Sequence, residues 1–270
     1  MSPHAFDTAI ALDAQGEGLW QGHTSPAYAN MVGPFGGTTA AVLLHAALRH
    51  PARLGDPIAL TVNYASALAD GAFEIDARAV RTNRSTQHWV LQLLQGDEVA
   101  ATATAVFAVR RATWSASEVV APAELPAPQT LPREDLTHRP PWVHRYDMRF
   151  VEGGMPSRFD GTEHPHSQTR VWVRDEPPRA IDFASLAALC DTFFPRVYLR
   201  RRKVVPIGTV SLTTYFHADA AMLAAQGDQP VLGSARGIVF RNGYCDQRGE
   251  VWSAQRELLA STQQVMYYRE

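Results

Sequence analysis

Three side chains in the C-terminal part of the sequence could together hold and activate one water molecule. Asp191 lies in an apolar stretch, Thr209 and Ser211 lie in a segment rich in hydroxyls, and Gln264 lies near the end of the chain. A carboxylate can take a proton from water, whereas a hydroxyl and a carboxamide can fix the water by hydrogen bonds. These residue types predict a hydrolase site if the fold brings them together.

Each of these residues also has an ordinary structural explanation. Asp191 could end its helix in solvent, but its neighbours Leu189, Cys190 and Phe193 are apolar. A carboxylate on a helix that is apolar nearly all round needs partners or a raised pKa, which favours a functional role. Gln264 could face solvent beside Gln263, and hydroxyl residues are common in strands. Their candidacy therefore depends on Asp191.

A proline-rich segment divides the chain into two parts of similar length. Residues 113–141 contain prolines too closely spaced for a helix or a central strand. We predict a linker over these residues, with one domain at 1–112 and another at 142–270. A chain of 270 residues is long enough for two domains.

Both parts show the same order of expected elements. Short strands come first, then an apolar helix, then longer strands. The first helix is expected over 38–50, opened by Gly36 and Gly37 and closed by Pro51, and the second from about Phe183 to Phe194. Strands are expected at 6–14, 16–23, 58–65, 73–83, 87–96 and 98–109, and again at 142–153, 167–176, 209–218, 230–242, 245–254 and 258–268.

The two parts also match residue by residue, as expected of an internal duplication. Asn83 and Asn242 are 242 − 83 = 159 positions apart, and the same shift places Glu98 on Glu257. Element order and residue register therefore agree. The same shift places Ala105 at the position of Gln264, so we expect one productive site per chain.

The expected fold class is α+β, with two tandem repeats that each wrap a curved antiparallel sheet around a long helix. That arrangement is the double hot-dog. The segments SLAALCDTFFP, TVSLTTYFH and GEVWSAQRELLASTQQ resemble the C-terminal half of bacterial type II acyl-CoA thioesterases, and VGPFGGTTAAVLLHAAL resembles the start of the helix in their N-terminal half. The similarity spans nearly the whole chain and is weakest in the linker.

This resemblance implies an acyl-CoA thioesterase that uses no metal, no cofactor and no covalent acyl-enzyme. By position, the water-binding residues of the family fall on Asp191, Gln264 and Thr209. Ser211, one strand repeat from Thr209, is expected on the same face and could share or replace its role. For the oxyanion hole, a backbone N–H near Gly36 and Gly37 or near Gln264 remains open.

Further residues are candidates for contact with an acyl-CoA substrate. The aromatic residues Phe35 and Phe194 could line an acyl tunnel, although plain core packing is the more ordinary explanation for both. Gly36 and Gly37 would lie beside the thioester. The coenzyme A phosphates could meet basic residues, for which Arg84 and Arg201 are candidates, the latter in the run 200–203.

Composition limits the other possibilities. A formal net charge of −2 gives no overall attraction to nucleic acid, and 46% hydrophobic residues favour a packed globular protein. The two cysteines fit no metal or redox spacing, and His164 with His166 lies in a polar loop, so we expect no metal site. Neither a secretory signal nor a membrane-spanning segment is evident, which predicts a cytoplasmic location.

Two other functions remain open for this fold. A hot-dog hydratase or dehydratase needs a His and Asp pair, and His45 is the nearest candidate in the first helix. A second alternative is a protein that binds acyl thioesters or lipids without turnover, which the pairing of Asp191 with Gln264 disfavours. Hot-dog proteins often pair through sheet edges, so we also expect a homo-oligomer.

Overall fold

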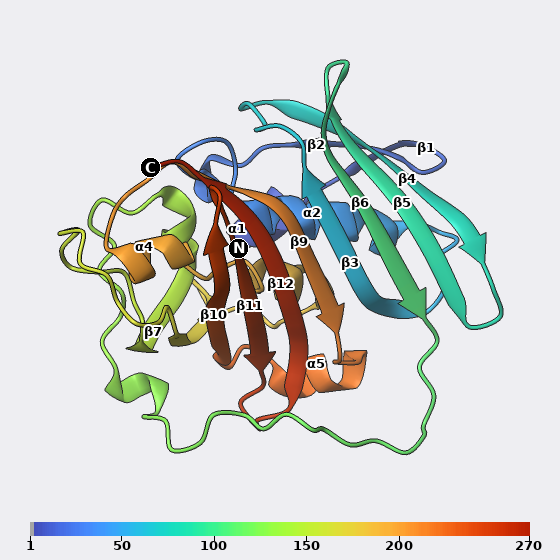
Figure 1. Ribbon diagram of the computed structural model, residues 1–270. Coiled ribbons are helices and arrows are strands. Elements are labelled where there is room, and N and C mark those ends of the chain that lie inside the picture. Colours follow the sequence, from blue (N-terminus) through green and yellow to red (C-terminus); the bar gives the residue numbers. More distant parts are fainter. Residues whose placement is uncertain (1–2) are drawn as a thin grey trace.

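The computed structural model describes residues 3–270, which form a single twelve-stranded antiparallel sheet that curves around two helices (Figure 1). The first half contains α1 (Ala5–Ala9), β1 (Asp13–Gly16), β2 (Leu19–His23), η1 (Pro26–Tyr28), α2 (Gly36–Arg49), β3 (Asp56–Tyr64), β4 (Ala72–Thr82), β5 (Thr86–Gln95) and β6 (Glu98–Ala108).

The second half repeats this order with two additional helices. It contains η3 (Pro141–Arg145), β7 (Tyr146–Glu152), β8 (Thr169–Asp175), α3 (Phe183–Leu189), α4 (Arg196–Arg201), β9 (Ile207–Phe216), α5 (Ala220–Gln226), β10 (Val231–Arg241), β11 (Tyr244–Trp252) and β12 (Leu258–Tyr268). Between the halves only a short 3-10 turn, η2 (Pro128–Thr130), is formed.

The sheet order shows the duplication directly. The strands follow one another as β1-β2-β4-β5-β6-β3 and then β9-β12-β11-β10-β8-β7, so the second half mirrors the first about the junction of β3 and β9. At that junction the hydroxyls of Thr61 and Thr213 lie 3.0 Å apart. Ala105 lies opposite Leu60 and Gln264 lies opposite Leu212, so these two residues hold corresponding places in the paired strands of each half.

Helix α2 lies in the concave side of the sheet, and Figure 1 shows it behind β9, β3 and β6. Most of it is buried, because small residues and leucines alternate around its surface. Its closest approach is to α3, where a Cβ built on Gly37 would lie 2.6 Å from the Ala188 carbonyl oxygen. Glycine at this position is therefore required for the two helices to pack so closely.

The second helix is shorter than predicted. We expected it to continue to Phe194, but α3 ends at Leu189. The Asp182 side chain caps its start, and at its end the Leu189 carbonyl accepts both the Thr192 hydroxyl at 2.8 Å and the Thr192 backbone N–H at 3.2 Å. Asp191 therefore lies just beyond the helix and not within it.

Other predictions of local structure were wrong near the chain start and in two connections. The segment 6–14, expected as a strand, forms helix α1 over most of its first part. Helices α4 and α5 were not predicted, because each is short and follows directly on a longer apolar segment. Neither error changes the sheet.

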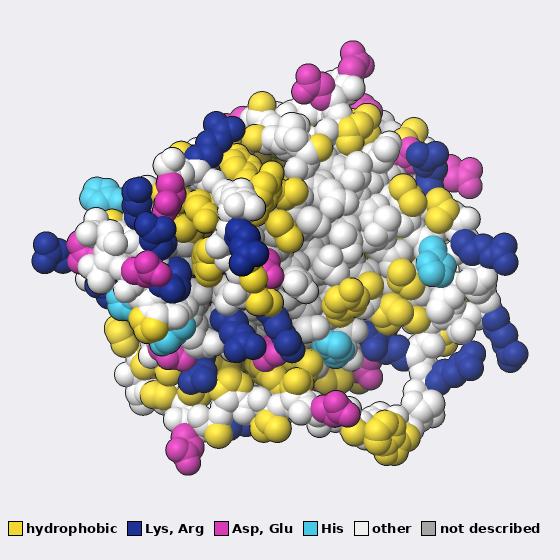
Figure 2. Space-filling model, in the orientation of Figure 1, with side chains coloured by type: hydrophobic (Ala, Val, Ile, Leu, Met, Phe, Trp, Pro, Cys, Tyr) yellow, Lys and Arg dark blue, Asp and Glu magenta, His cyan; other side chains and the backbone are white. Residues whose placement is uncertain are grey.

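The outer face of the sheet differs between the two halves. The linker packs against β10 and β11 of the second half, where Ala121 contacts Leu232 and Trp252. Over β9, β3 and β6 the outer face is instead nearly free of charged side chains and mostly white in Figure 2. Both cysteines, Cys190 and Cys245, are buried free thiols, as expected. Within residues 3–270, no helix is long and apolar enough to cross a membrane.

Candidate active site

The side chain of Gln264 is hydrogen-bonded to both Asp191 and Thr209, the two other residues of the predicted site. Its amide nitrogen donates to Asp191 Oδ1 at 2.8 Å and to Thr209 Oγ1 at 2.7 Å. Gln264 comes from β12, Thr209 from β9 and Asp191 from the segment after α3. Residues up to 73 positions apart therefore meet within hydrogen-bond distance.

The carboxylate of Asp191 lies in a place that favours its neutral form. Burial raises its pKa to about 7, against the lowering effect of hydrogen bonds from the Gln264 amide and the Gly37 backbone N–H. A carboxyl group that titrates near neutral pH can both accept and return a proton under physiological conditions. Asp191 is therefore a candidate general base.

Thr209 reaches Gln264 because β9 contains a bulge. The register between β9 and β12 pairs Ser211 with Val265 and Thr209 with Met266, which leaves Val210 as an extra residue. The bulge changes the alternation of side chains, so Thr209 faces inward with Gln264, whereas Ser211 faces the outer side. The prediction that Ser211 shares a face with Thr209 is therefore wrong.

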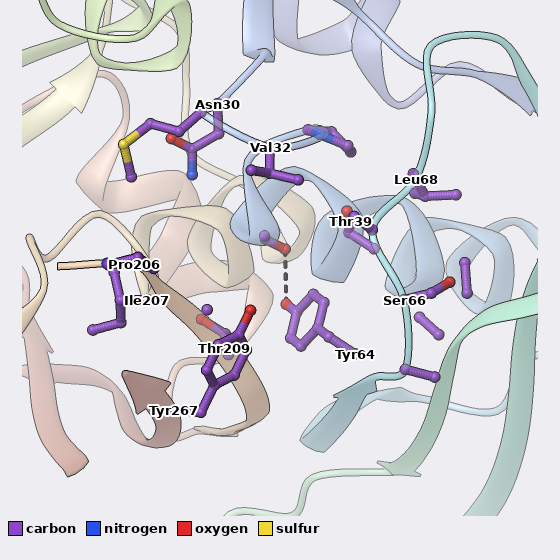
Figure 3. Close-up of a pocket in the computed structure, with 18 of the residues that line it drawn as sticks. Asn30, Val32, Thr39, Tyr64, Ser66, Leu68, Pro206, Ile207, Thr209 and Tyr267 are labelled. Atoms are coloured by element: carbon purple, nitrogen blue, oxygen red, sulfur yellow. Dashed lines mark hydrogen bonds between the residues drawn. The ribbon is translucent and has the colours of Figure 1, made fainter. Parts of the chain in front are cut away.

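A cavity of about 550 Å³ opens beside these residues, and Figure 3 shows the side chains that line it. Gly36 from the start of α2, Tyr64 from the end of β3 and Thr209 from β9 all face it. The rest of its wall comes from three segments, 30–34, 65–68 and 204–208, together with Thr39, Ala100, Ala101, Tyr198 and Tyr267. Both halves of the chain thus contribute to the cavity.

Tyr64 is a residue of this site that the sequence did not reveal. Its hydroxyl donates to the Gly36 carbonyl at 2.8 Å, the bond drawn in Figure 3. A Cβ built on Gly36 would lie 2.9 Å from Asp191 Oδ2 and 3.5 Å from the Tyr64 hydroxyl, so Asp191 and Tyr64 face the same small space. Burial and the Asp191 charge raise the pKa of Tyr64 well above its ordinary value. Nothing in the strand pattern of 58–65 distinguished Tyr64 from a core residue.

The expected substrate contacts fall into two groups. Gly36 lines the cavity, and the backbone N–H of Gly37 lowers the pKa of the Asp191 carboxyl group. Phe35 and Phe194 do not line the cavity, because each is buried in an aromatic cluster. The ring centroids of Phe35 and Trp142 lie 4.2 Å apart, and those of Phe194 and Phe150 lie 5.5 Å apart. Their expected role in an acyl tunnel is not what the structure shows.

The two basic candidates are also placed unfavourably for phosphate contact. Arg84 lies in the turn after β4, whereas the cavity meets the loop before β4. The eleven residues of β4 separate these ends by roughly 33 Å at 3.3 Å per residue. Arg201 forms an ion pair with Glu270 at 3.0 Å, so its charge is already partly matched.

The repeated sheet-and-helix unit defines the protein as a double hot-dog. A family model described as the acyl-CoA thioesterase C-terminal domain matches residues 119–268, and the corresponding N-terminal model matches residues 25–108. The chain therefore belongs to the acyl-CoA thioesterase family. No curated protein matches it in a sequence search.

Solved structures agree with this assignment. A hot-dog protein of unknown function from Alicyclobacillus acidocaldarius is 48% identical, with a TM-score of 0.94 over 100% of this chain and 99% of that chain. The TesB protein of Mycobacterium avium subsp. paratuberculosis is 17% identical, with a TM-score of 0.80 over 99% and 100%. The acyl-CoA thioesterase II TesB2 of Mycobacterium marinum is 17% identical, with a TM-score of 0.77 over 98% of each chain. At this identity the last two establish the fold alone.

Proposed function

We propose that the protein hydrolyses acyl-CoA thioesters to the free acid and coenzyme A. The observation that carries this proposal is the Gln264 amide group, which joins Asp191 and Thr209 beside a cavity. The cavity volume of about 550 Å³ lies within the usual range for small-molecule sites. Family membership supports the same substrate class.

In this mechanism a water molecule held near Asp191 and Gln264 attacks the thioester carbonyl carbon. Asp191 takes the water proton as the new C–O bond forms, which gives a tetrahedral intermediate with a negative oxygen. The C–S bond then breaks, and the coenzyme A thiolate accepts the proton back from Asp191. Holding the water in one position supplies part of the rate enhancement, because attack is then effectively unimolecular.

The negative oxygen of the intermediate needs a donor close to the cavity. The Gly37 N–H lowers the pKa of Asp191, so we assign it to the carboxylate and look to a neighbouring donor for the oxyanion. The Gly36 N–H, in the first turn of the fourteen-residue helix α2, is therefore our candidate donor. The positive end of the α2 dipole favours negative charge at the same place.

The direct test is a panel of acyl-CoA esters incubated with the purified protein, with the released thiol measured. Thiol release that depends on the protein would support the proposal. No thiol release together with a rise in melting temperature on ligand addition would favour the binding protein instead. Hydration of crotonyl-CoA would favour a hydratase, for which His45 on α2 is the candidate, although it does not line the cavity.

The rate should depend on pH through the ionisation of Asp191. Because burial raises the pKa of Asp191 to about 7, the base is protonated and inactive at lower pH. We expect kcat/KM to fall about tenfold per pH unit below this value and to level off above it. Rates measured from about pH 5.5 to about pH 8.5 would check this, and a flat profile would contradict the role of Asp191.

The bulge in β9 predicts different roles for the two hydroxyl residues. Replacing Thr209 by Val removes the acceptor of one Gln264 hydrogen bond and keeps the side-chain shape. One such bond contributes about 0.5–1.5 kcal/mol, so kcat should fall roughly 3-fold to 10-fold. Ser211→Ala is the matched control and should change kcat less than twofold. A larger loss for Ser211→Ala than for Thr209→Val would rule out this assignment.

Three further properties remain predictions. Coenzyme A phosphates would be met by Lys203, which is exposed and directly precedes the cavity residue Val204, in place of Arg84. A homo-oligomer and a cytoplasmic location also remain expectations.

A further inference from the structure

The orientation of the Gln264 amide is central to the site, because an amide can turn over and exchange its oxygen and nitrogen. In the structure the Gln264 nitrogen faces both Asp191 and Thr209. If the amide turned over, its oxygen would face an ionised carboxylate, which has no proton to donate. Ionised Asp191 therefore favours this orientation, and a donor to the Gln264 oxygen would also hold the amide there when Asp191 is protonated.

Gln247 on β11 is in the position to do this. Its amide nitrogen donates to Gln264 Oε1 at 3.1 Å. The two residues are direct cross-strand partners, and both side chains are buried on the inner face, with 1% and 3% of their surface exposed. The hydrogen bond therefore fixes the end of the Gln264 amide that is farthest from Asp191.

We propose that Gln247 is a positioning residue, which holds the Gln264 amide with its nitrogen toward Asp191 and so preserves the hydrogen bond from Gln264 to the base. This inference rests on the proposed function. Gln247 contacts neither Asp191 nor Thr209 in any hydrogen bond of residues 3–270, so it acts only through Gln264.

A second observation separates this role from simple packing. The side-chain amide oxygen of Gln247, Oε1, is buried and accepts no hydrogen bond from residues 3–270. An unmet buried acceptor destabilises a fold, and an apolar side chain at this position would avoid that cost. The amide of Gln247 is therefore better explained by what its nitrogen does than by stability.

The effect should be visible in the titration of Asp191. Loss of the Gln247 donor frees the Gln264 amide to turn over, which removes the hydrogen bond that lowers the Asp191 pKa. The titratable groups that feel the Asp191 charge are Tyr64, Tyr146 and Cys190, and burial raises the pKa of each above its ordinary value. These three groups stay neutral over the pH range of the activity measurements, so they do not contribute to the pH profile.

The test is Gln247→Met, which keeps an unbranched side chain but cannot donate a hydrogen bond. The control is Gln263→Met, at the exposed residue that precedes Gln264 in β12. We expect kcat to fall about tenfold, KM to change less than twofold, and the acid limb of the pH profile to move to higher pH. The control should change none of these. A kcat loss without a moved acid limb would mean that Gln247 is only structural, and no change at all would also overturn the proposal.

A second variant covers the case in which Gln247→Met does not fold. In Gln247→Glu the protonated side chain can still donate to Gln264 Oε1, but the ionised form cannot. Its activity relative to the wild type should therefore decline as pH rises, and a constant ratio would contradict the proposal. Titration of the Asp191 carboxyl by ¹³C NMR without substrate tests Gln247 even if the protein hydrolyses no acyl-CoA, which separates the two proposals.

Discussion

Asp191→Asn is expected to lower kcat by at least about a hundredfold, the usual loss when a general base is removed. The substituted amide keeps the shape of the side chain and can still contact Gln264, but it cannot take the proton of the attacking water. Thiol release from a good acyl-CoA substrate under saturating conditions measures the effect. Residual activity within threefold of the wild type would end the proposed mechanism.

The same substitution should not weaken the fold, which makes it a clean test. The pKa of Asp191 is about 7 in the folded protein and about 3.9 in an unfolded chain, so the folded form binds the proton more tightly. The contribution of Asp191 protonation to the free energy of unfolding is therefore complete below about pH 4 and is lost as pH rises through about 7. At about pH 8 the Asn variant should melt at the same or a higher temperature, and a lower one would point to a structural role.

Gly37→Ala is expected to destabilise the protein, because the added Cβ would lie 2.6 Å from the Ala188 carbonyl oxygen and 2.5 Å from the Phe35 ring. A backbone carbonyl cannot move aside without moving α3. Overpacking of this kind costs about 1–3 kcal/mol, and at roughly 2–4 °C per kcal/mol the melting temperature should fall by about 2–12 °C. Thermal unfolding followed by circular dichroism would measure the change.

Gly36→Ala is the matched control, because it should lower activity and leave the melting temperature nearly unchanged. Its Cβ would meet the end of a side chain, Asp191 Oδ2, at 2.9 Å. A side chain can turn away, so the melting temperature should change little, whereas activity should fall at least about tenfold because the carboxylate is displaced. Equal melting temperatures for Gly36→Ala and Gly37→Ala would contradict the assignment of these two glycines.

The sequence predicted the repeat and the sheet well, because strand alternation and the 159-residue shift are properties of the pattern itself. The meeting of Asp191 with Gln264 was also predicted, although the register alone could not give the distance. The sequence could not show which of Thr209 and Ser211 faces Gln264. A bulge of one residue at Val210 decides this, and it has no recognisable pattern in a strand rich in Thr and Ser. Tyr64 and Gln247 were missed for a similar reason, because each lies within an ordinary strand sequence.

The end of the second helix shows what local patterns cannot reveal. The apolar run through Phe194 fits a longer helix, but α3 ends at Leu189 and a tighter turn over 190–192 follows it. This turn places Asp191 against Gly36 and Gly37 of the other repeat. Such a turn is specified by contacts between the halves, which no single segment contains.

The unequal pair of Gln264 and Ala105 at corresponding positions means that the two copies contribute differently. The second copy supplies the hydrogen-bonded side chains of the candidate site, whereas the first supplies Gly36, Gly37 and Tyr64 beside them. Each copy is then indispensable for a different reason, and neither could be discarded or exchanged without ending the shared task.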